Sequence, residues 1–306
     1  QQKEFIECRD NELGSPFIRK IFGSQCPELW TMFPKYGKDG EIKTYTSDYD
    51  ATDAQNKLIR ACTLKNDAYG IFNPGRRLRD AGAWIDDDGE LIYHYGDHVV
   101  KVGNDGETEF QPGEVDGYVY AASEKLNKHA ERGCKDWNTI KYFFEDLHTW
   151  NWVDSFAPKL LLGWIAESFI GGALDWRGCI WINGDAGTGK SSITEKMLSR
   201  LFGDGILTSA NYTEAAVRQV VGAKHLPVAL DELEAGANYQ KQTALIELAR
   251  AAASGSKAFR GGQDHNATEF ELKSCFAFSS INLPPMKPQD RQRIAILNLK
   301  KLELCV

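Results

Sequence analysis

Apolar and polar positions alternate differently in the two halves of the chain. From residue 151 onward, apolar residues with helical spacing alternate with short, fully apolar runs that are typical of buried strands. The pattern predicts helices near 155–170 and at Ser191–Phe202, Thr213–Val221 and Gln240–Ala253, and strands at Cys179–Ile182, Val228–Leu230, Cys275–Ser279 and Ile294–Leu299. Such alternation predicts a mostly parallel sheet with covering helices.

The first half of the chain has a different pattern. Between residues 1 and 150, aromatic and β-forming residues alternate with Gly, Asp and Asn turn residues, and Gly82–Gly96 predicts two short strands around an Asp-Gly turn. We therefore expect an α/β protein with a smaller mixed α/β domain over 1–150 and a mostly parallel sheet domain over 151–306. The chain stops directly after the last predicted strand, so we expect the second domain to be truncated at its C-terminus.

Composition and charge narrow the class of protein. The 306 residues are 42% hydrophobic and 26% charged, which is typical of a globular protein with a sizeable core. The net charge of −7 predicts that any contact with nucleic acid is local. Seven scattered cysteines and six histidines show no ligand spacing, so we expect neither a zinc site nor a disulfide framework.

The most apolar run of the sequence, Leu160–Leu174, contains Glu167 and is too short to cross a bilayer. The N-terminus is polar, unlike a signal peptide. We therefore expect a cytoplasmic protein without membrane contact.

A glycine-rich turn joins the strand at Cys179–Ile182 to the helix that follows it. The turn has the P-loop pattern Gly-x-x-x-x-Gly-Lys-Ser, whose glycines let backbone N–H groups point inward at phosphate oxygens. The start of the helix adds its positive dipole end. The expected phosphate-binding residues are Gly184, Asp185, Ala186, Gly187, Thr188, Gly189, Lys190, Ser191 and Ser192. We expect Lys190 to reach the β- and γ-phosphates of ATP and Ser191 to bind Mg²⁺.

Two acidic residues follow the apolar strand Val228–Leu230. We expect Asp231 to hold Mg²⁺ through water and Glu232 to orient and deprotonate the attacking water. An Asp-Glu pair also ends many strands as a solvated turn, so this interpretation depends on the P-loop. With the P-loop present, the pair predicts an ATPase that hydrolyses its nucleotide.

Polar residues also follow or precede the last two predicted strands. Asn282 could polarise the attacking water or contact the γ-phosphate, with Ser279 and Ser280 as alternatives to it.

Arg291 and Arg293 precede the final strand, at an edge of the sheet that is poorly placed for the chain's own nucleotide. We expect one of them, preferably Arg293, to act in trans as an arginine finger, which predicts a homo-oligomer. A surface arginine pair is the alternative.

These motifs, in this order, resemble an AAA+ ATPase. More narrowly, "LLLGWIAESFIGGALDWRGCIWINGDAGTGKSS", "LPVALDELEA", "FELKSCFAFSSIN" and "DRQRIAILNL" resemble the helicase part of phage- and mobile-element-encoded primase-helicases, near superfamily III, over roughly residues 74 to 300. The resemblance implies a ring, usually hexameric, with ATP between subunits and single-stranded or forked DNA at the centre. It assigns the ATP motifs to Lys190, Ser191, Asp231, Glu232, Asn282 and one of Arg291 and Arg293. We find no primase motif in the sequence.

The resemblance also implies a DNA-binding hairpin before the strand at Cys275–Ser279. The segment "SGSKAFRGGQDHNATEF" supplies its basic residues, which are Lys257, Arg260 and His265. One basic residue per subunit, repeated around a ring, builds a positive pore despite an acidic total charge. A solvated loop is the alternative. The densest basic cluster is Arg76, Arg77 and Arg79, which could either bind phosphates or form a solvated turn.

The sequence therefore predicts an ATP-dependent DNA helicase or translocase that serves replication of a phage or mobile element. Two other functions stay open. An AAA+ remodeller or loader would act on a protein and use ATP as an assembly switch, and its ATPase would not respond to DNA. A P-loop phosphotransferase would act on a small molecule, but the acid pair and the late arginines do not favour it.

Overall fold

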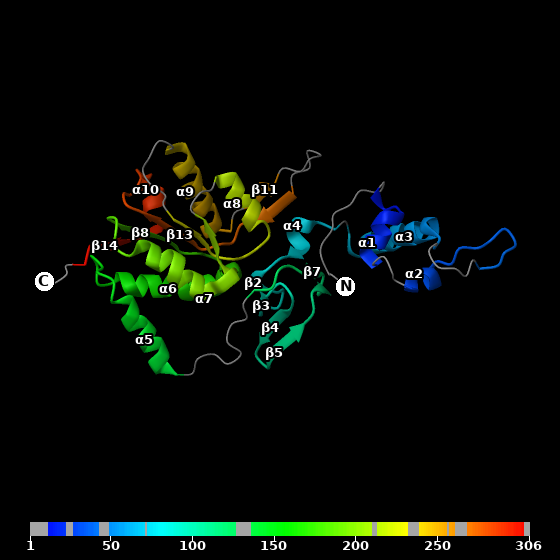
Figure 1. The fold of residues 1–306 in the computed structure, drawn as a ribbon, viewed down its shortest axis with the longest axis horizontal. Coiled ribbons are helices and arrows are strands. Elements are labelled where there is room, and N and C mark those ends of the chain that lie inside the picture. Colours follow the sequence, from blue (N-terminus) through cyan, green and yellow to red (C-terminus); the bar gives the residue numbers. More distant parts are fainter. Residues whose placement is uncertain are drawn as a thin grey trace. The chain divides into compact units, whose positions relative to one another are not determined.

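A computed structural model describes residues 12–22, 27–42, 49–70, 72–126, 136–209, 213–231, 239–255, 257–260 and 268–302 of the chain. The chain folds into two compact units, Gln1–Asn73 and Pro74–Val306. The expected boundary near residue 150 lies inside the second unit. Figure 1 shows the elements of both units.

The first unit is mainly helical where it is described. It contains α1 (Ser15–Phe22), α2 (Pro27–Met32) and α3 (Ala51–Tyr69), and α1 lies against α3. Its small core is formed by Ile18, Leu29, Phe33, Tyr49 and Ala54. The strands predicted within the first 150 residues therefore belong to the second unit.

A five-stranded parallel sheet forms the centre of the second unit. Its order is β14-β8-β13-β10-β9. The strands are β8 (Cys179–Gly184), β9 (Leu207–Ser209), β10 (Val228–Leu230), β13 (Phe276–Ser280) and β14 (Ile294–Leu299). Every residue of β10 and β13 is buried, as expected for strands that are covered on both faces. The predicted mixed α/β class and mostly parallel sheet are confirmed.

Helices cover the two faces of this sheet. One face packs against α5 (Trp137–Leu147), α6 (Ala157–Ile170), the π-helix η3 (Ser192–Leu198) and α7 (Ser199–Phe202). The other face packs against α8 (Glu214–Val221) and α9 (Tyr239–Ala253). Side chains of β8 alternate between the two faces of the sheet. Ile180 and Ile182 pack in the core that α6 and α7 cover, whereas Trp181 packs in the core that α8 and α9 cover. In Figure 1, α6 and α7 lie on one side of the sheet and α8 and α9 on the other.

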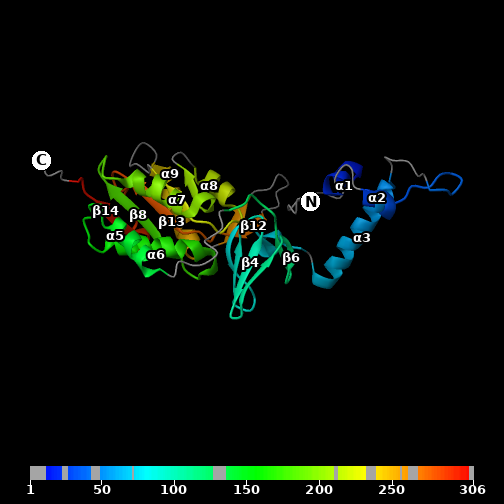
Figure 2. The same cartoon turned by 60° about the horizontal axis from the view of Figure 1, so that its bottom comes forward.

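An antiparallel sheet precedes these elements in the second unit. It is a meander of β2 (Gly82–Ile85), β3 (Leu91–His94), β4 (Val99–Gly103) and β5 (Gly106–Phe110) (Figure 2). The predicted hairpin over Gly82–Gly96 is confirmed, with Gly89 at the turn at a φ of +82°. After α4 (Pro74–Arg77), a smaller sheet joins β1 (Leu78–Arg79), β7 (Tyr118–Tyr120) and β6 (Gly113–Val115).

His225 joins the antiparallel sheet to the segment that leads into β10. Its ring stacks on Trp84 with a centroid distance of 3.6 Å, and its Nδ1 lies 3.0 Å from the carbonyl oxygen of Ala83. Its backbone N–H donates to the carbonyl oxygen of Ala81 at 2.9 Å. These buried contacts join residues 74–126 to the parallel sheet, so the first unit ends at Asn73 rather than near residue 150.

Candidate functional site

The glycine-rich loop lies at the carboxyl end of β8 and curves back on itself. The ammonium of Lys190 donates to the carbonyl oxygens of Gly184 and Asp185, at 2.5 and 2.9 Å. Gly187 and Gly189 have φ values of +79° and +93°, which only glycine adopts readily. The predicted loop conformation therefore depends on these two glycines, and it holds one cation against its own backbone.

Solvent reaches the outer part of this loop. Asp185, Ala186, Gly187 and Ser191 are exposed, whereas Thr188 is buried and its hydroxyl donates to the carbonyl oxygen of Asp185 at 2.9 Å. A ligand can therefore approach the exposed backbone while the buried side fixes its shape. The described loop residues fit a phosphate group, since they combine an accessible turn, two glycines with positive φ and a cation.

The segment after the loop is wound as a π-helix before it becomes α-helical. The expected helix at Ser191–Phe202 is observed as η3 followed by α7. Within η3, the hydroxyl of Thr194 donates to the carbonyl oxygen of Lys190 at 3.3 Å and lies 3.4 Å from a carboxylate oxygen of Asp231. Thr194 thereby connects the loop to the acidic residue, a contact that the sequence did not predict. π-helical turns are frequent at functional sites.

Asp231 follows β10 and lies beside β13, the strand that separates β10 from β8. The residue is 7% exposed. One carboxylate oxygen accepts a hydrogen bond from the hydroxyl of Ser279, and the other lies near the hydroxyl of Thr194. A buried carboxylate requires such donors, which also fix its orientation. Glu232 lies outside the described residues.

The end of β13 brings Ser279, rather than Asn282, to the acidic residue. Ser279 was one of the two predicted alternatives to Asn282, with Ser280 as the other, and Asn282 is exposed. The carbonyl oxygen of Asn282 accepts a hydrogen bond of 2.9 Å from the Ser280 hydroxyl. That hydroxyl in turn accepts one of 2.8 Å from the indole of Trp181. Ser280 therefore fixes the turn that contains Asn282, and Ser279 is the residue that forms a hydrogen bond with Asp231.

The two predicted arginines lie near the opposite end of the sheet from the loop. Arg291 ends α10 (Pro288–Arg291), and Arg293 directly precedes β14. In the register of the sheet, Ile294 is level with Cys179, at the start of β8, and Leu299 is level with Gly184 in the loop. The length of β8, six residues, separates these ends by about 20 Å. Arg293 therefore lies far from the loop of its own chain.

The predicted hairpin before β13 is present. Its strands β11 (Lys257–Arg260) and β12 (Thr268–Glu271) are antiparallel, with Arg260 opposite Thr268. The short helix α4, which contains Arg76 and Arg77, lies against β12. His265 lies outside the described residues.

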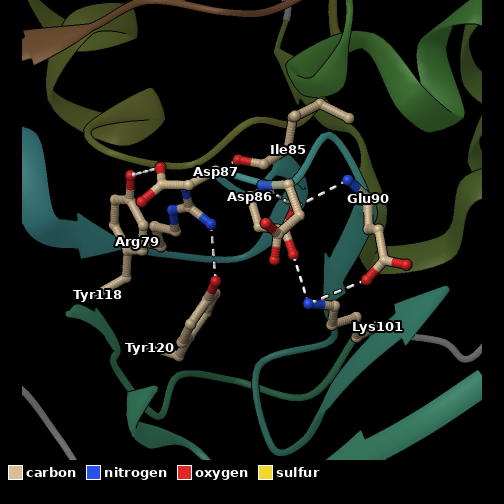
Figure 3. Close-up of polar contacts among 9 residues, drawn as sticks. Arg79, Ile85, Asp86, Asp87, Glu90, Lys101, Tyr118 and Tyr120 are labelled. Carbon is tan, nitrogen blue, oxygen red and sulfur yellow. Dashed lines mark hydrogen bonds and ion pairs between the residues drawn. The ribbon is translucent and has the colours of Figure 1, made fainter. Parts of the chain in front are cut away.

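Arg79 is buried, so it belongs neither to a phosphate-binding cluster nor to a solvated turn. Its guanidinium lies 3.4 Å from the ring centroid of Tyr118 and donates to the hydroxyl of Tyr120 at 2.7 Å and the carbonyl oxygen of Ile85 at 2.8 Å (Figure 3). Nearby, Lys101 pairs with Asp86 at 2.6 Å. These contacts make Arg79 a structural residue of the small sheets.

The described parts of the chain contain no group of three or more His, Cys, Asp or Glu side chains that could hold a metal ion. No helix in the same ranges combines the length and apolar character that crossing a membrane requires.

No family model and no curated protein matches this sequence. Solved structures that it resembles include apo forms of the C-terminal region of NrS-1. An A form of that region has a TM-score of 0.43 and 14% identity over 85% of this chain and 56% of the neighbour. The apo structure of its segment 305–718 has a TM-score of 0.41 and 15% identity over 84% of this chain. The chain spans little more than half of these neighbours, at 56% of each.

Proposed function

We propose that the protein is a ring-forming P-loop ATPase of the AAA+ type that moves along single-stranded DNA during replication of a phage or mobile element. One observation carries the proposal. The glycine loop with Lys190 and the oriented carboxylate of Asp231 occupy the carboxyl edge of one parallel sheet. Ligands of open α/β sheets bind at that edge.

The loop is the proposed ATP site. Its backbone amides and the start of η3 supply partial positive charge, and Lys190 supplies a full one. The Lys190 ammonium now binds the carbonyl oxygens of Gly184 and Asp185, so phosphate oxygens would offer it stronger, charged acceptors. This exchange favours a nucleoside triphosphate as the ligand.

Mg²⁺ is the proposed cofactor. Ser191 is exposed beside the loop and Asp231 offers a carboxylate, which are oxygen ligands that Mg²⁺ prefers. The ion would supply charge neutralisation on the phosphates. Thr194 and Ser279 orient Asp231 in the described structure, and Glu232 is the proposed base that orients the attacking water.

Arg293 is proposed to complete the ATP site of a neighbouring subunit, with Arg291 as the alternative. Its position at the far end of the sheet supports action in trans, because about 20 Å separates it from its own loop. A heterologous contact of this kind forms a ring when its repeated rotation closes on itself. We propose a homo-oligomer, with a hexamer as the expected ring.

The β11–β12 hairpin is the proposed DNA contact. Lys257 and Arg260 belong to β11, and His265 lies in the sequence between the residues of β11 and those of β12. Basic residues repeated around a ring would attract the phosphates of single-stranded or forked DNA, and the attraction would weaken with salt.

Steady-state ATP turnover with and without single-stranded DNA tests this function. We expect DNA to stimulate turnover, Lys190→Ala to abolish it, Arg293→Ala to reduce it about a thousandfold to a measurable residual rate, and Arg260→Ala to remove only the stimulation. Lys196→Ala and Arg200→Ala, which alter exposed side chains on η3 and α7, are matched controls that should behave like the wild type. Moderate salt should reduce the stimulation more than the basal rate.

The outcome that contradicts the DNA proposal is also specific. If the chain is oligomeric by sedimentation and hydrolyses ATP at the same rate with and without DNA, it is not a DNA translocase. An AAA+ protein remodeller or loader would then account for the same ATP site.

A further inference from the structure

The guanidinium of Arg293 lies over the indole ring of Trp176, with 5.2 Å between its ζ carbon and the ring centroid. Trp176 is 51% exposed. It precedes β8 by three residues, and Arg293 precedes β14 by one, so both lie at the amino end of the sheet. A cation over an aromatic face is held by electrostatic attraction.

Arg177 fixes the backbone that carries Trp176. Arg177 is 1% exposed, and its backbone N–H donates to the carbonyl oxygen of Ala253 at 3.0 Å. The guanidinium donates to four carbonyl oxygens, those of Gly171, Leu174, Asp175 and Ala252. A buried guanidinium is costly unless its donors are bonded, so this set of contacts specifies one arrangement of the segment. Trp176 therefore stands on a backbone that is fixed to the end of α9.

Asp290 fixes the backbone that carries Arg293. The carbonyl oxygen of Asp290 accepts a hydrogen bond of 3.0 Å from the backbone N–H of Arg293. Asp290 is 3% exposed, and its carboxylate forms an ion pair with Arg250 at 2.7 Å. Arg250 belongs to the last turn of α9. The arginine and the aromatic ring beneath it are thus both tied to the same helix end.

We propose that Trp176 is a positioning residue that orders the Arg293 side chain before it meets the nucleotide of a neighbouring copy of this chain. The proposal rests on the proposed function, because it takes Arg293 as the arginine given in trans. A free arginine side chain samples many rotamers, and it loses that conformational entropy when it docks on a neighbouring subunit. Stacking on a fixed ring restricts the rotamers before docking, so less entropy is lost when the guanidinium reaches the nucleotide.

The Trp176→Leu variant is the first test. We expect ATP turnover in the ring to fall about three- to tenfold with little change in the KM for ATP, because an exposed cation–π contact is modest and acts through the transition state. Trp176→Phe keeps a ring face and should recover part of the loss. Trp137→Leu is the matched control, since Trp137 is 80% exposed on α5 and should leave turnover unchanged. Sedimentation should show the same oligomer for all variants.

A double variant shows whether Trp176 acts through Arg293. In an Arg293→Ala background, Trp176→Leu should cause no further loss of turnover, because the ring has no guanidinium to order. An equal further loss in that background would overturn the proposal. Full turnover in Trp176→Leu alone would also overturn it. If Arg293→Ala still caused its large loss of turnover in that case, the proposed function would stand without this inference. If Arg293→Ala itself left turnover unchanged, the arginine role in the proposed function would fail, and this inference with it.

Discussion

The indole nitrogen of Trp150 donates a hydrogen bond to the carbonyl oxygen of Gly189, across 3.3 Å. Trp150 lies between α5 and α6, and its ring packs in the core on that face of the sheet. A partly buried indole N–H requires an acceptor, and here the acceptor belongs to the glycine loop. The contact supports the loop from one side and leaves little room around Gly189.

Alanine substitutions at the two loop glycines should have unequal effects. At Gly187, φ is +79° but a Cβ would meet nothing within 4 Å; at Gly189, φ is +93° and a Cβ would lie 2.8 Å from the Trp150 nitrogen. Gly189→Ala should therefore weaken nucleotide binding by roughly tenfold more than Gly187→Ala, because strain adds to a clash. Titration with a fluorescent ATP analogue measures both. Equal affinities would show that the Trp150 contact does not shape the loop.

The hydroxyl of Ser279 should stabilise both the fold and the orientation of the Asp231 carboxylate. Ser279→Ala removes a hydrogen bond to Asp231, and such bonds to charged groups contribute about 1.5–3 kcal/mol. We expect a loss of that order in the free energy of unfolding by urea and a lower ATP turnover. Thr194→Val should cost less, since its contact with Asp231 is longer, at 3.4 Å.

Thr194→Ser is the matched control for these variants, because it keeps the hydroxyl and removes one methyl group. Its turnover should stay near that of the wild type. If Ser279→Ala retained both stability and turnover, Ser279 would not orient Asp231.

The parallel sheet was predictable because its strands are apolar on both faces. Val228–Leu230 and Ile294–Leu299 were located to the residue, and β13 lies one residue beyond its predicted range. By contrast, Leu207–Ser209 contains one apolar residue, too few to mark a strand. α5 was missed although Ile140, Phe143, Phe144 and Leu147 have helical spacing that would have revealed it.

The glycine loop was locatable because its residues are contiguous, whereas the contacts of Asp231 depend on strand order. Ser279 reaches Asp231 only because β13 lies beside β10, which a single sequence does not state. Likewise, nothing in the run of three arginines distinguishes Arg79, whose burial depends on Tyr118 and Tyr120 some 40 residues later. Local motifs were therefore recovered, and tertiary partners were not.

Acid should weaken the junction that His225 forms. Burial, with a smaller effect from Lys273, lowers the pKa of His225 to about 3. Burial also lowers the pKa of His94. An unfolded histidine has a pKa of about 6.5, so between these values the unfolded chain binds more protons. The free energy of unfolding should be at its full value above pH 6.5. It should fall toward pH 3, by up to about 1.4 kcal/mol per pH unit for His225.

Urea unfolding between pH 7 and 4.5 measures this slope. His225→Asn should be less stable at pH 7, through lost packing on Trp84, but should show a shallower pH dependence. His148→Asn is the control, because His148 is exposed on the loop after α5 and should keep the wild-type slope. A variant at position 225 with an unchanged slope would assign the acid sensitivity to other groups.

Replacing Arg79 by lysine should loosen the small sheet without altering ATP chemistry. The guanidinium uses one nitrogen on the Tyr120 hydroxyl, another on the carbonyl oxygen of Ile85, and its plane on Tyr118; an ammonium lacks that geometry. We expect a local loss of about 2 kcal/mol, which is roughly thirtyfold faster hydrogen exchange of the amides in β1 and β7. Arg76→Lys, at an exposed position on α4, should leave exchange unchanged. If Arg79→Lys instead kept the exchange rates and weakened DNA binding with a smaller salt dependence, Arg79 would contact phosphate, contrary to its buried place between the two tyrosines.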